Sequence, residues 1–391
     1  MRHSRASDRR LRALAATVVG ALLVACGPDD SASGSEKAAG TAAGADSATA
    51  RSTVYRLVDV APGVYATVVG EGVNPSQWAT SLIVVRSDHV LVVDTRQHAA
   101  AAEELLETVA AVSDLPVRYV VNTHWHGDHV QGNAAFRTRY PDVRIIGGVT
   151  TAEDMRTLGR QRLGDEIERV DDRLAAGRRW LERGERDDGT PLTDEEKAAL
   201  PGQIEAAEAY VEARRGLELL PPDLVVDSTL ALTDAEPRVE IVRVGPAHTR
   251  GDVIVALPEL RVAAIGDLIE DGFPWYGDGY PAGWAGALDR IGRLEVDVFL
   301  PGHGPVLRDR EMFDVQRRFA HALVDEARRA VQAGLTREAA RAAADFSQFE
   351  AHFTRRLAER PPQERHERFA AFIDETFARA FEEASGSVAN P

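Results

Sequence analysis

Three of the eleven histidines in the chain fall within one six-residue segment, HWHGDH at positions 124–129. An apolar run precedes this segment, so we expect it at the end of a strand. At a strand end, side chains two residues apart point the same way, so His124 and His126 can bind one metal ion. The chain then turns, so Asp128 and His129 can face a second direction. Imidazole and carboxylate are ligands that zinc and iron accept, so the segment predicts a metal site.

Further candidate ligands follow other expected strands. They are His248 in GPAHTRGD after 239–244, Asp267 in AIGDLI after 262–265, and His303 in LPGHG after 298–300. Together with the HxHxDH segment, these elements resemble the pattern of the metallo-β-lactamase superfamily, over residues 53–310. The resemblance implies an αββα sandwich, in which two β-sheets pack face to face, helices cover them on the outside, and the metals lie at one edge.

The resemblance also implies how the ligands divide between two ions. The first ion is held by His124, His126 and His248, the second by Asp128, His129 and His303, and Asp267 bridges both. A carboxylate suits the bridging position because it offers two oxygens and a negative charge. The expected cofactor is a pair of Zn²⁺ ions, and iron is also compatible with these ligands. A thiolate ligand is excluded, because the only cysteine is Cys26, in the expected signal peptide.

Two divalent ions about 3.5–4 Å apart lower the pKa of a shared water toward 7 and polarise the bond that is cleaved. The resemblance therefore implies a hydrolase that acts on an ester, thioester, lactone, amide or phosphodiester bond. Asp128 is the expected catalytic residue, which orients the hydroxide and passes a proton to the leaving group. Fold and metal ligands alone do not select among these substrates.

Other activities of the same fold stay open. Segments such as NTHWHGDHVQGN look like those of periplasmic hydrolases of the quinoprotein relay type, a label that indicates little about substrate. β-Lactam hydrolysis fits an exported protein, but many such enzymes have a lysine just after the bridging position, where this chain has Glu270 and Asp271. Glyoxalase II uses the same seven ligands, yet its basic glutathione site is not evident here. An iron-dependent persulfide dioxygenase or redox enzyme is a further alternative, whereas the intact ligand set disfavours a non-catalytic binding module.

Several residues near the motifs have two interpretations each. Asp94, after the strand expected at 90–93, either holds a ligand histidine or forms a turn. Arg250 either meets an anionic substrate or pairs with an acidic neighbour. Four aromatic residues either line a substrate groove or pack in the core, namely Trp125, Trp275, Tyr276 and Trp284. Five further histidines have no ligand spacing and are expected to be ordinary residues, namely His89, His98, His321, His352 and His366.

Short β-branched runs separated by turn residues predict strands on both sides of the motifs. They cover 53–60, 64–69, 81–85, 90–93, 117–121 and 143–146 in the first half, and 229–232, 239–244, 252–257, 262–265 and 298–300 in the second. Helical patterns are expected at 99–112 and near 284–294. Strands and helices alternate in both halves, so the fold class is mixed α/β (α+β).

Two helical regions are expected in addition to the sandwich. In 151–220, 30 of 70 residues are charged, and apolar residues repeat at intervals of three and four, which predicts an insertion of two amphipathic helices. Thr193 and Glu196 have the spacing of a capping box. The insertion either covers the substrate or decorates the surface. Residues 311–391 predict a helical C-terminal extension, interrupted at Gly334 and Pro361.

The N-terminal residues resemble an export signal. A basic stretch, an apolar run and the sequence LVAC ending at Cys26 are similar to a bacterial lipoprotein signal peptide over 1–26. Residues 27–52 are mostly small and polar, which predicts a disordered linker. The protein is therefore expected to be exported to the periplasm or the cell surface and attached to a membrane by a lipid on Cys26.

The chain is acidic, with 46 Lys and Arg against 62 Asp and Glu and a formal net charge of −16. This charge disfavours binding to nucleic acid, because the phosphates would be repelled. A small-molecule substrate is the expected partner, and the sequence predicts no particular oligomeric state.

Overall fold

The computed structural model describes residues 54–70 and 78–387. The predicted signal peptide at 1–26, with Cys26, and the predicted linker at 27–52 lie outside the described residues. Among the described residues, no helix combines the length and apolar character that a membrane crossing needs.

The first sheet contains seven strands that pair in the order in which they occur along the chain. They are β1 (Tyr55–Ala61), β2 (Val64–Val69), β3 (Ser81–Val85), β4 (Val90–Val93), β5 (Val117–Val121), β6 (Arg144–Gly148) and β7 (Leu224–Val226). β1 to β4 form an antiparallel meander, and β4 to β7 run parallel. The parallel pairs require crossovers, and α2 (Ala99–Val112) and α4 (Asn133–Arg139) supply the first two of the three.

The second sheet contains five strands in the order β12-β11-β10-β9-β8. They are β8 (Thr229–Leu232), β9 (Val239–Arg243), β10 (Val253–Leu257), β11 (Val262–Glu270) and β12 (Val298–His303). Only the pair β11 and β12 is parallel in this sheet, and the helix α8 (Pro281–Gly292) connects these two strands.

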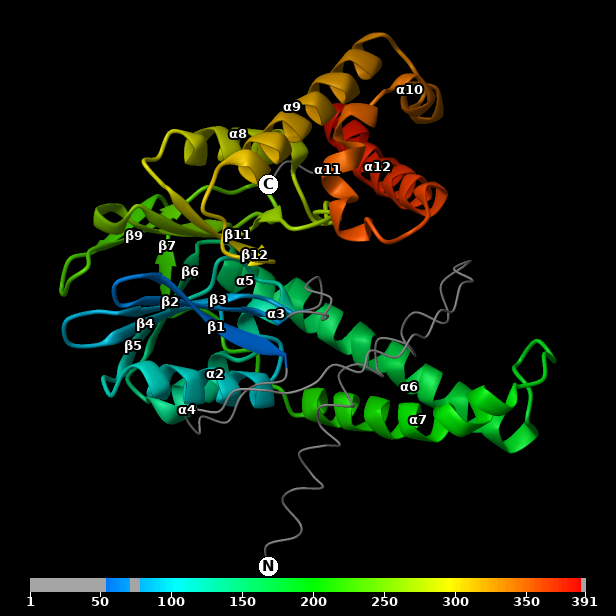
Figure 1. Ribbon diagram of the computed structural model, residues 1–391, viewed down its shortest axis with the longest axis horizontal. Helices are drawn as coiled ribbons and strands as arrows, with labels where there is room; N and C mark the ends of the chain where they lie inside the picture. Colours follow the sequence, from blue (N-terminus) through cyan, green and yellow to red (C-terminus); the bar gives the residue numbers. More distant parts are fainter. Residues whose placement is uncertain (1–53, 71–77, 388–391) are drawn as a thin grey trace, which may run out of the picture. The chain divides into compact units, whose positions relative to one another are not determined.

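The alternation of side chains along each strand builds the layers. Leu91 and Val255 belong to the core between the two sheets, whereas the neighbouring Val92 packs with Leu105 of α2. On the outer face of the second sheet, Ile254 packs in the same cluster as residues of α8. Figure 1 shows the resulting order of helix, sheet, sheet and helix, which is the expected αββα sandwich.

The structure corrects several sequence-based boundaries. β11 continues to Glu270 and β12 to His303, so Asp267 and His303 lie within strands instead of just after them. The pairing of β11 with β12 shifts register on both sides of Gly266. The pattern of apolar residues in the sequence does not predict these shifts. β7, a strand of three residues, was not predicted.

The C-terminal extension packs onto the sandwich. It contains α9 (Glu311–Gln332), α10 (Arg337–Ala343), α11 (Glu350–Phe353) and α12 (Pro362–Ala384). Phe319 of α9 and Phe377 of α12 share one apolar cluster with Trp284 of α8. The extension and the sandwich, Val54–Gly159 with Glu218–Pro391, form one compact unit, and Figure 1 shows α9 beside α8.

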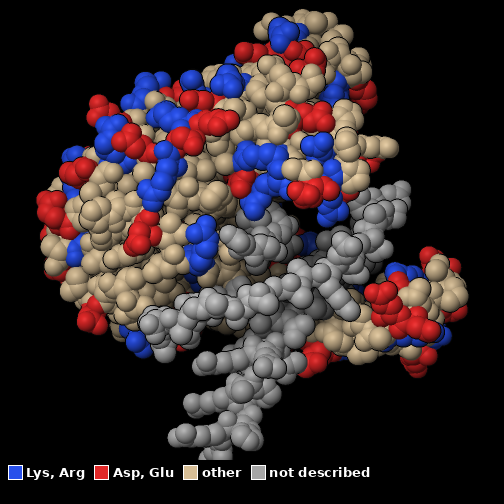
Figure 2. Space-filling model, in the orientation of Figure 1, with Lys and Arg blue, Asp and Glu red and all other residues tan. Residues whose placement is uncertain are grey.

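Residues 160–217 belong to a second compact unit. The two helices expected there are α6 (Arg160–Arg183) and α7 (Asp194–Arg215), which pack through Leu174, Ile204 and their neighbours. The predicted capping box is present, because Thr193 Oγ1 accepts from Glu196 N at 3.2 Å and Thr193 N donates to Glu196 Oε2 at 2.8 Å. Both signs of charge are exposed on this unit, and Figure 2 shows them close together at one of its ends. The short α5 (Thr151–Asp154) precedes it.

Candidate metal centre

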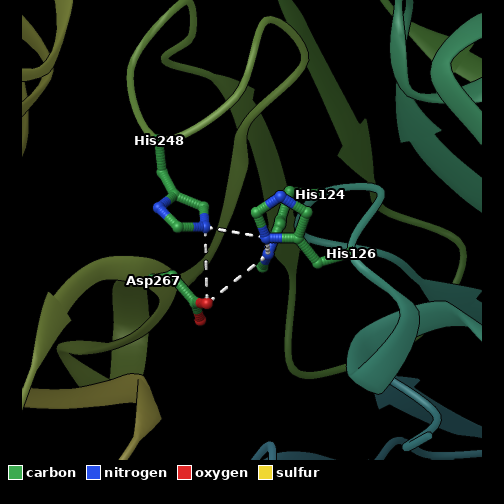
Figure 3. Close-up of side chains that lie close together, drawn as sticks. All are labelled: His124, His126, His248 and Asp267. Atoms are coloured by element: carbon green, nitrogen blue, oxygen red, sulfur yellow. Dashed lines mark hydrogen bonds and ion pairs between the residues drawn. The ribbon is translucent and has the colours of Figure 1, made fainter. Parts of the chain in front are cut away.

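Four side chains from three separate segments of the chain converge at one edge of the sandwich. His124 and His126 follow β5, His248 lies in the loop between β9 and β10, and Asp267 lies in β11 (Figure 3). His126 Nδ1 is 3.1 Å from His124 Nε2 and 2.9 Å from His248 Nε2. Asp267 Oδ2 is 3.5 Å from Nε2 of both His124 and His248. Three imidazole nitrogens and a carboxylate oxygen therefore face one small volume, as ligands of one ion would.

A second group of three side chains lies next to the first. It consists of Asp128 and His129, on the short helix α3 (Gly127–Val130), and His303 at the end of β12. Asp128 Oδ2 lies 3.2 Å from His303 Nε2 and 3.5 Å from His129 Nε2. The structure thus brings together all seven residues that the sequence identified as candidate ligands.

Asp267 lies between the two groups. Its Oδ2 atom is 3.4 Å from His303 Nε2, and its Oδ1 atom is 3.3 Å from His129 Nε2, in addition to its contacts with the first group. One carboxylate therefore reaches histidines of both groups, which is the geometry that a bridging ligand needs.

Two glycines allow this position of Asp267. Gly266 has φ of +56°, a backbone conformation that favours glycine. At Gly302, on the neighbouring strand, a Cβ atom would lie 1.7 Å from Asp267 Oδ1. The bulged β11 and the missing side chain at 302 together turn the Asp267 carboxylate toward the histidines.

Asp94 holds His129 directly and His124 through Thr123, on the sides of the rings that face away from the ligand groups. Its Oδ2 atom accepts from His129 Nδ1 at 2.8 Å, and the carboxylate also accepts from the backbone N and Oγ1 of Thr123, each at 2.8 Å. Thr123 Oγ1 is in turn 3.0 Å from His124 Nδ1. These contacts leave Nε2 of both rings facing the ligand groups, so the interpretation of Asp94 as a support for a ligand histidine is confirmed.

The protonation of the two groups differs. Burial and neighbouring imidazoles lower the pKa of His248 to about 3 and that of His124 well below its usual range. For His129 and His303, burial lowers the pKa, but Asp267 and Asp128 outweigh it and raise the pKa well above its usual value. Without metal, His124 and His248 are therefore neutral imidazoles, whereas the second group contains imidazolium rings beside carboxylates.

The donor set fits divalent cations. His129 Nε2 and Asp267 Oδ1 are fully buried, and neither makes a hydrogen bond within the described residues. Leaving buried polar atoms without partners costs about 1–3 kcal/mol each. A cation bound by both groups would satisfy these atoms and would replace the protons on the second group.

Of the four aromatic residues near the motifs, only one remains exposed. Trp275 is 44% exposed, and its ring centre lies 5.3 Å from that of His126. Trp125 is buried against the same ring, and Tyr276 stacks on Trp284 at 4.1 Å in the core. Trp275 is therefore placed to contact a substrate, and the other three pack.

Arg250 pairs with acidic neighbours, which is the second of the two roles that the sequence left open for it. Its guanidinium pairs with Asp154 and lies 3.5 Å from Glu153. The other five histidines among the described residues lie outside both ligand groups. His89, for example, bonds to Arg86, and His98 caps α2.

Sequence reasoning missed Asp278. Its Oδ2 atom lies 2.8 Å from His126 Nε2, and its side chain is 23% exposed. Asp278 lies in the loop 271–280, whose segment DGFPWYGDGY shows no ligand spacing. No residue pattern near position 278 therefore predicts its contact with His126.

The chain is similar in sequence to known proteins. The sequence model of the metallo-beta-lactamase superfamily matches residues 77–303. A linear primary-alkylsulfatase from a Pseudomonas species is 24% identical over 267 residues, which cover 63% of this chain and 46% of that protein. The chain thus aligns with less than half of the length of this relative.

Solved structures of metallo-β-lactamases are also similar. The protein from Pontibacter korlensis is 19% identical with a TM-score of 0.46, covering 68% of this chain and 99% of that one. FIM-1 from Pseudomonas aeruginosa, in its mono-zinc form, is 21% identical with a TM-score of 0.45, covering 69% of this chain and 96% of that one. Because the superfamily match spans more than half of the chain and both groups of His and Asp side chains lie within it, the chain belongs to the metallo-β-lactamase superfamily.

Proposed function

We propose that the protein is a dinuclear zinc hydrolase that acts on an ester, thioester, lactone, amide or phosphodiester bond of a small molecule. The observation that carries this proposal is the Asp267 carboxylate, which lies within 3.5 Å of histidines of both ligand groups. All seven candidate ligands offer nitrogen or oxygen, which zinc accepts. Two bound zinc ions would supply a water of lowered pKa and a Lewis acid for the scissile group.

Asp128 is the residue best placed to move protons. Its side chain is 26% exposed, so it faces both the ligand groups and the solvent side. Burial raises its pKa, but His129 and His303 outweigh this and keep the pKa below its usual range. An ionised carboxylate at this place can orient the attacking water, accept its proton and return the proton to the leaving group.

Hydrolysis of a sulfate ester is a second candidate. Its support is the alkylsulfatase relative, whose similarity to this chain is 24% over 267 residues. A sulfate ester also needs an activated water and stabilisation of a leaving oxygen, which the same site would provide. Because the chain aligns with less than half of that relative, we include alkyl sulfates beside the other substrates as a test.

β-Lactam hydrolysis receives less support from the segment after Asp267. Glu270 is buried, and burial together with Asp267 raises its pKa to about 8. Asp271 pairs with Arg355 and Arg356. The arginines near this segment are therefore already occupied by a carboxylate, and no lysine takes the place that many β-lactamases use to bind the drug.

The deciding experiment is elemental analysis of the purified full-length protein, followed by a panel of substrates. We expect about two zinc ions per chain and turnover of at least one ester class, with Asp128→Ala folded but inactive. One iron per chain would favour a persulfide dioxygenase or another redox enzyme. Absence of metal after incubation with zinc would refute the dinuclear site.

For the location, we propose a lipoprotein anchored outside the cytoplasm through Cys26. The support is the basic and apolar N-terminal sequence with its terminal LVAC, followed by a linker of small polar residues. The Cys26→Ser variant should leave the membrane fraction. A variant that stays firmly membrane-bound would refute the lipid anchor.

A further inference from the structure

The loop between β11 and α8, residues 271–280, contacts the first ligand group. Trp275 packs on the His126 ring, and Asp278 accepts a hydrogen bond from it. Tyr280 N donates to Ala247 O at 2.7 Å, which ties the loop to the segment that carries His248. This loop therefore adjoins two of the three histidines in the group.

Asp278 determines which nitrogen of His126 is free for metal. His126 Nδ1 faces His124 and His248, whereas Nε2 lies 2.8 Å from Asp278 Oδ2. A carboxylate acceptor keeps the proton on Nε2 and leaves the lone pair on Nδ1. A partner on the outer nitrogen also fixes the ring plane and raises the basicity of the ligand nitrogen.

The C-terminal extension holds this loop at both ends. Arg379 Nε of α12 donates to Gly279 O at 2.7 Å, one residue from Asp278. At the other end, Arg356 lies 2.7 Å from Asp271 Oδ2, and Arg355 pairs with the same carboxylate. These three arginines come after residue 303, where the match to the superfamily ends.

Two further contacts strengthen the attachment. The Phe273 ring lies 5.0 Å from that of Phe372 in α12. Glu383 Oε2, also in α12, accepts from Ala282 N at 2.8 Å, in the first turn of the helix that follows the loop. Polar and apolar contacts thus fix the loop to the extension at Asp271, Phe273 and Gly279.

We propose that Asp278 is a positioning residue of the first metal site and that the C-terminal extension keeps it in place through Arg379. The proposal rests on the dinuclear hydrolase function above. It assigns to the extension a role in metal binding in addition to its place in the shared apolar core. The ligand of the site that Asp278 supports would be a divalent cation bound through His126 Nδ1.

The test is titration of the metal-free full-length protein with Zn²⁺ against a chromophoric chelator. Asp278→Ala should weaken the binding step of the first site by about 10–100-fold, the range seen when such supporting partners are lost. Asp278→Asn keeps a neutral acceptor and should give a smaller loss. This order of effects, with thermal unfolding of the metal-free protein unchanged, separates positioning from general destabilisation.

Arg379→Ala tests the role of the extension. We expect faster hydrogen exchange of the backbone amides in 272–280 and a weaker first zinc step. The matched control is Arg341→Ala, because Arg341 pairs at 2.6 Å with Asp374 inside the extension and makes no such contact with the loop. The control should change neither the exchange nor the zinc affinity.

The outcomes distinguish this proposal from the function on which it rests. If the unmodified protein binds two zinc ions and Asp278→Ala binds them equally well, Asp278 has no positioning role while the hydrolase stands. If Asp278→Ala binds zinc more weakly while Arg379→Ala behaves like the unmodified protein, the role of the extension is refuted. If the unmodified protein binds no zinc, the proposed function itself fails.

Discussion

Gly302→Ala should disable the metal centre through one added methyl group. The new Cβ atom would lie 1.7 Å from Asp267 Oδ1 and 2.9 Å from Asp267 Cγ. Ordinary contact begins at 3.4 Å, so the carboxylate or its strand has to move by about 1.7 Å, the difference between 3.4 and 1.7. Misplacement of a reacting group by about 1 Å can cost about 100-fold in rate, and Asp267 serves both ligand groups. We therefore expect a loss of at least about 100-fold in kcat/KM.

The assay combines kcat/KM on the best substrate of the panel with zinc content and thermal unfolding. Crowding in a packed interior costs about 1–3 kcal/mol, so the variant should remain folded while it loses metal. The matched control is Gly286→Ala in α8, where a Cβ atom would meet open space. It should be neutral, or more stable by about 0.5–1 kcal/mol. A Gly302→Ala protein with two zinc ions and normal kcat/KM would refute the bridging role of Asp267.

Two other predictions concern the second ligand group, one through the Asp94 carboxylate that holds His129 and one through the protonation of His129 and His303. Asp94→Ala should weaken the second zinc step by about 10–100-fold, measured by chelator competition, and equal affinity would contradict the support of His129 by Asp94. The pKa of His129 and His303 is raised, so their contribution to metal-free stability is complete below about pH 6.5 and is lost as pH rises through the raised pKa. Glu270, with a pKa raised to about 8, acts in the same direction. Urea unfolding of metal-free protein should therefore show stability that falls between about pH 6 and 9, and stability that rises over this range would contradict these charges. Added zinc should reverse the fall, because binding requires neutral imidazole.

Much of the fold could be predicted because its signals are local. Alternation of apolar residues identified most strands, and helical spacing identified α2, α6 and α7. The limits of β11 could not be predicted, because its last residues pair with β12 across the bulge at Gly266 and carry no alternating pattern. β7 is too short to give a pattern, and only its pairing with β6 makes it a strand.

The identity of the seven candidate ligands was determined by the sequence alone. Their motifs occur along the chain in the order that the superfamily pattern has, so the chain order carries the information. Asp94 and Arg250 each had two possible roles on the sequence, and only the tertiary structure decided which one each residue has. Asp94 meets His129, 35 residues away, and Arg250 meets Asp154, 96 residues away.

The same physical reason explains why Asp278 and Arg379 escaped the sequence. Asp278 is 152 residues from His126, and Arg379 is 100 residues from Gly279. A hydrogen bond between such partners depends on how loops and helices pack, and no spacing of residue types encodes it. The sequence determined which side chains can bind metal, whereas the packing of the C-terminal extension against the loop 271–280 decided how one of them is held.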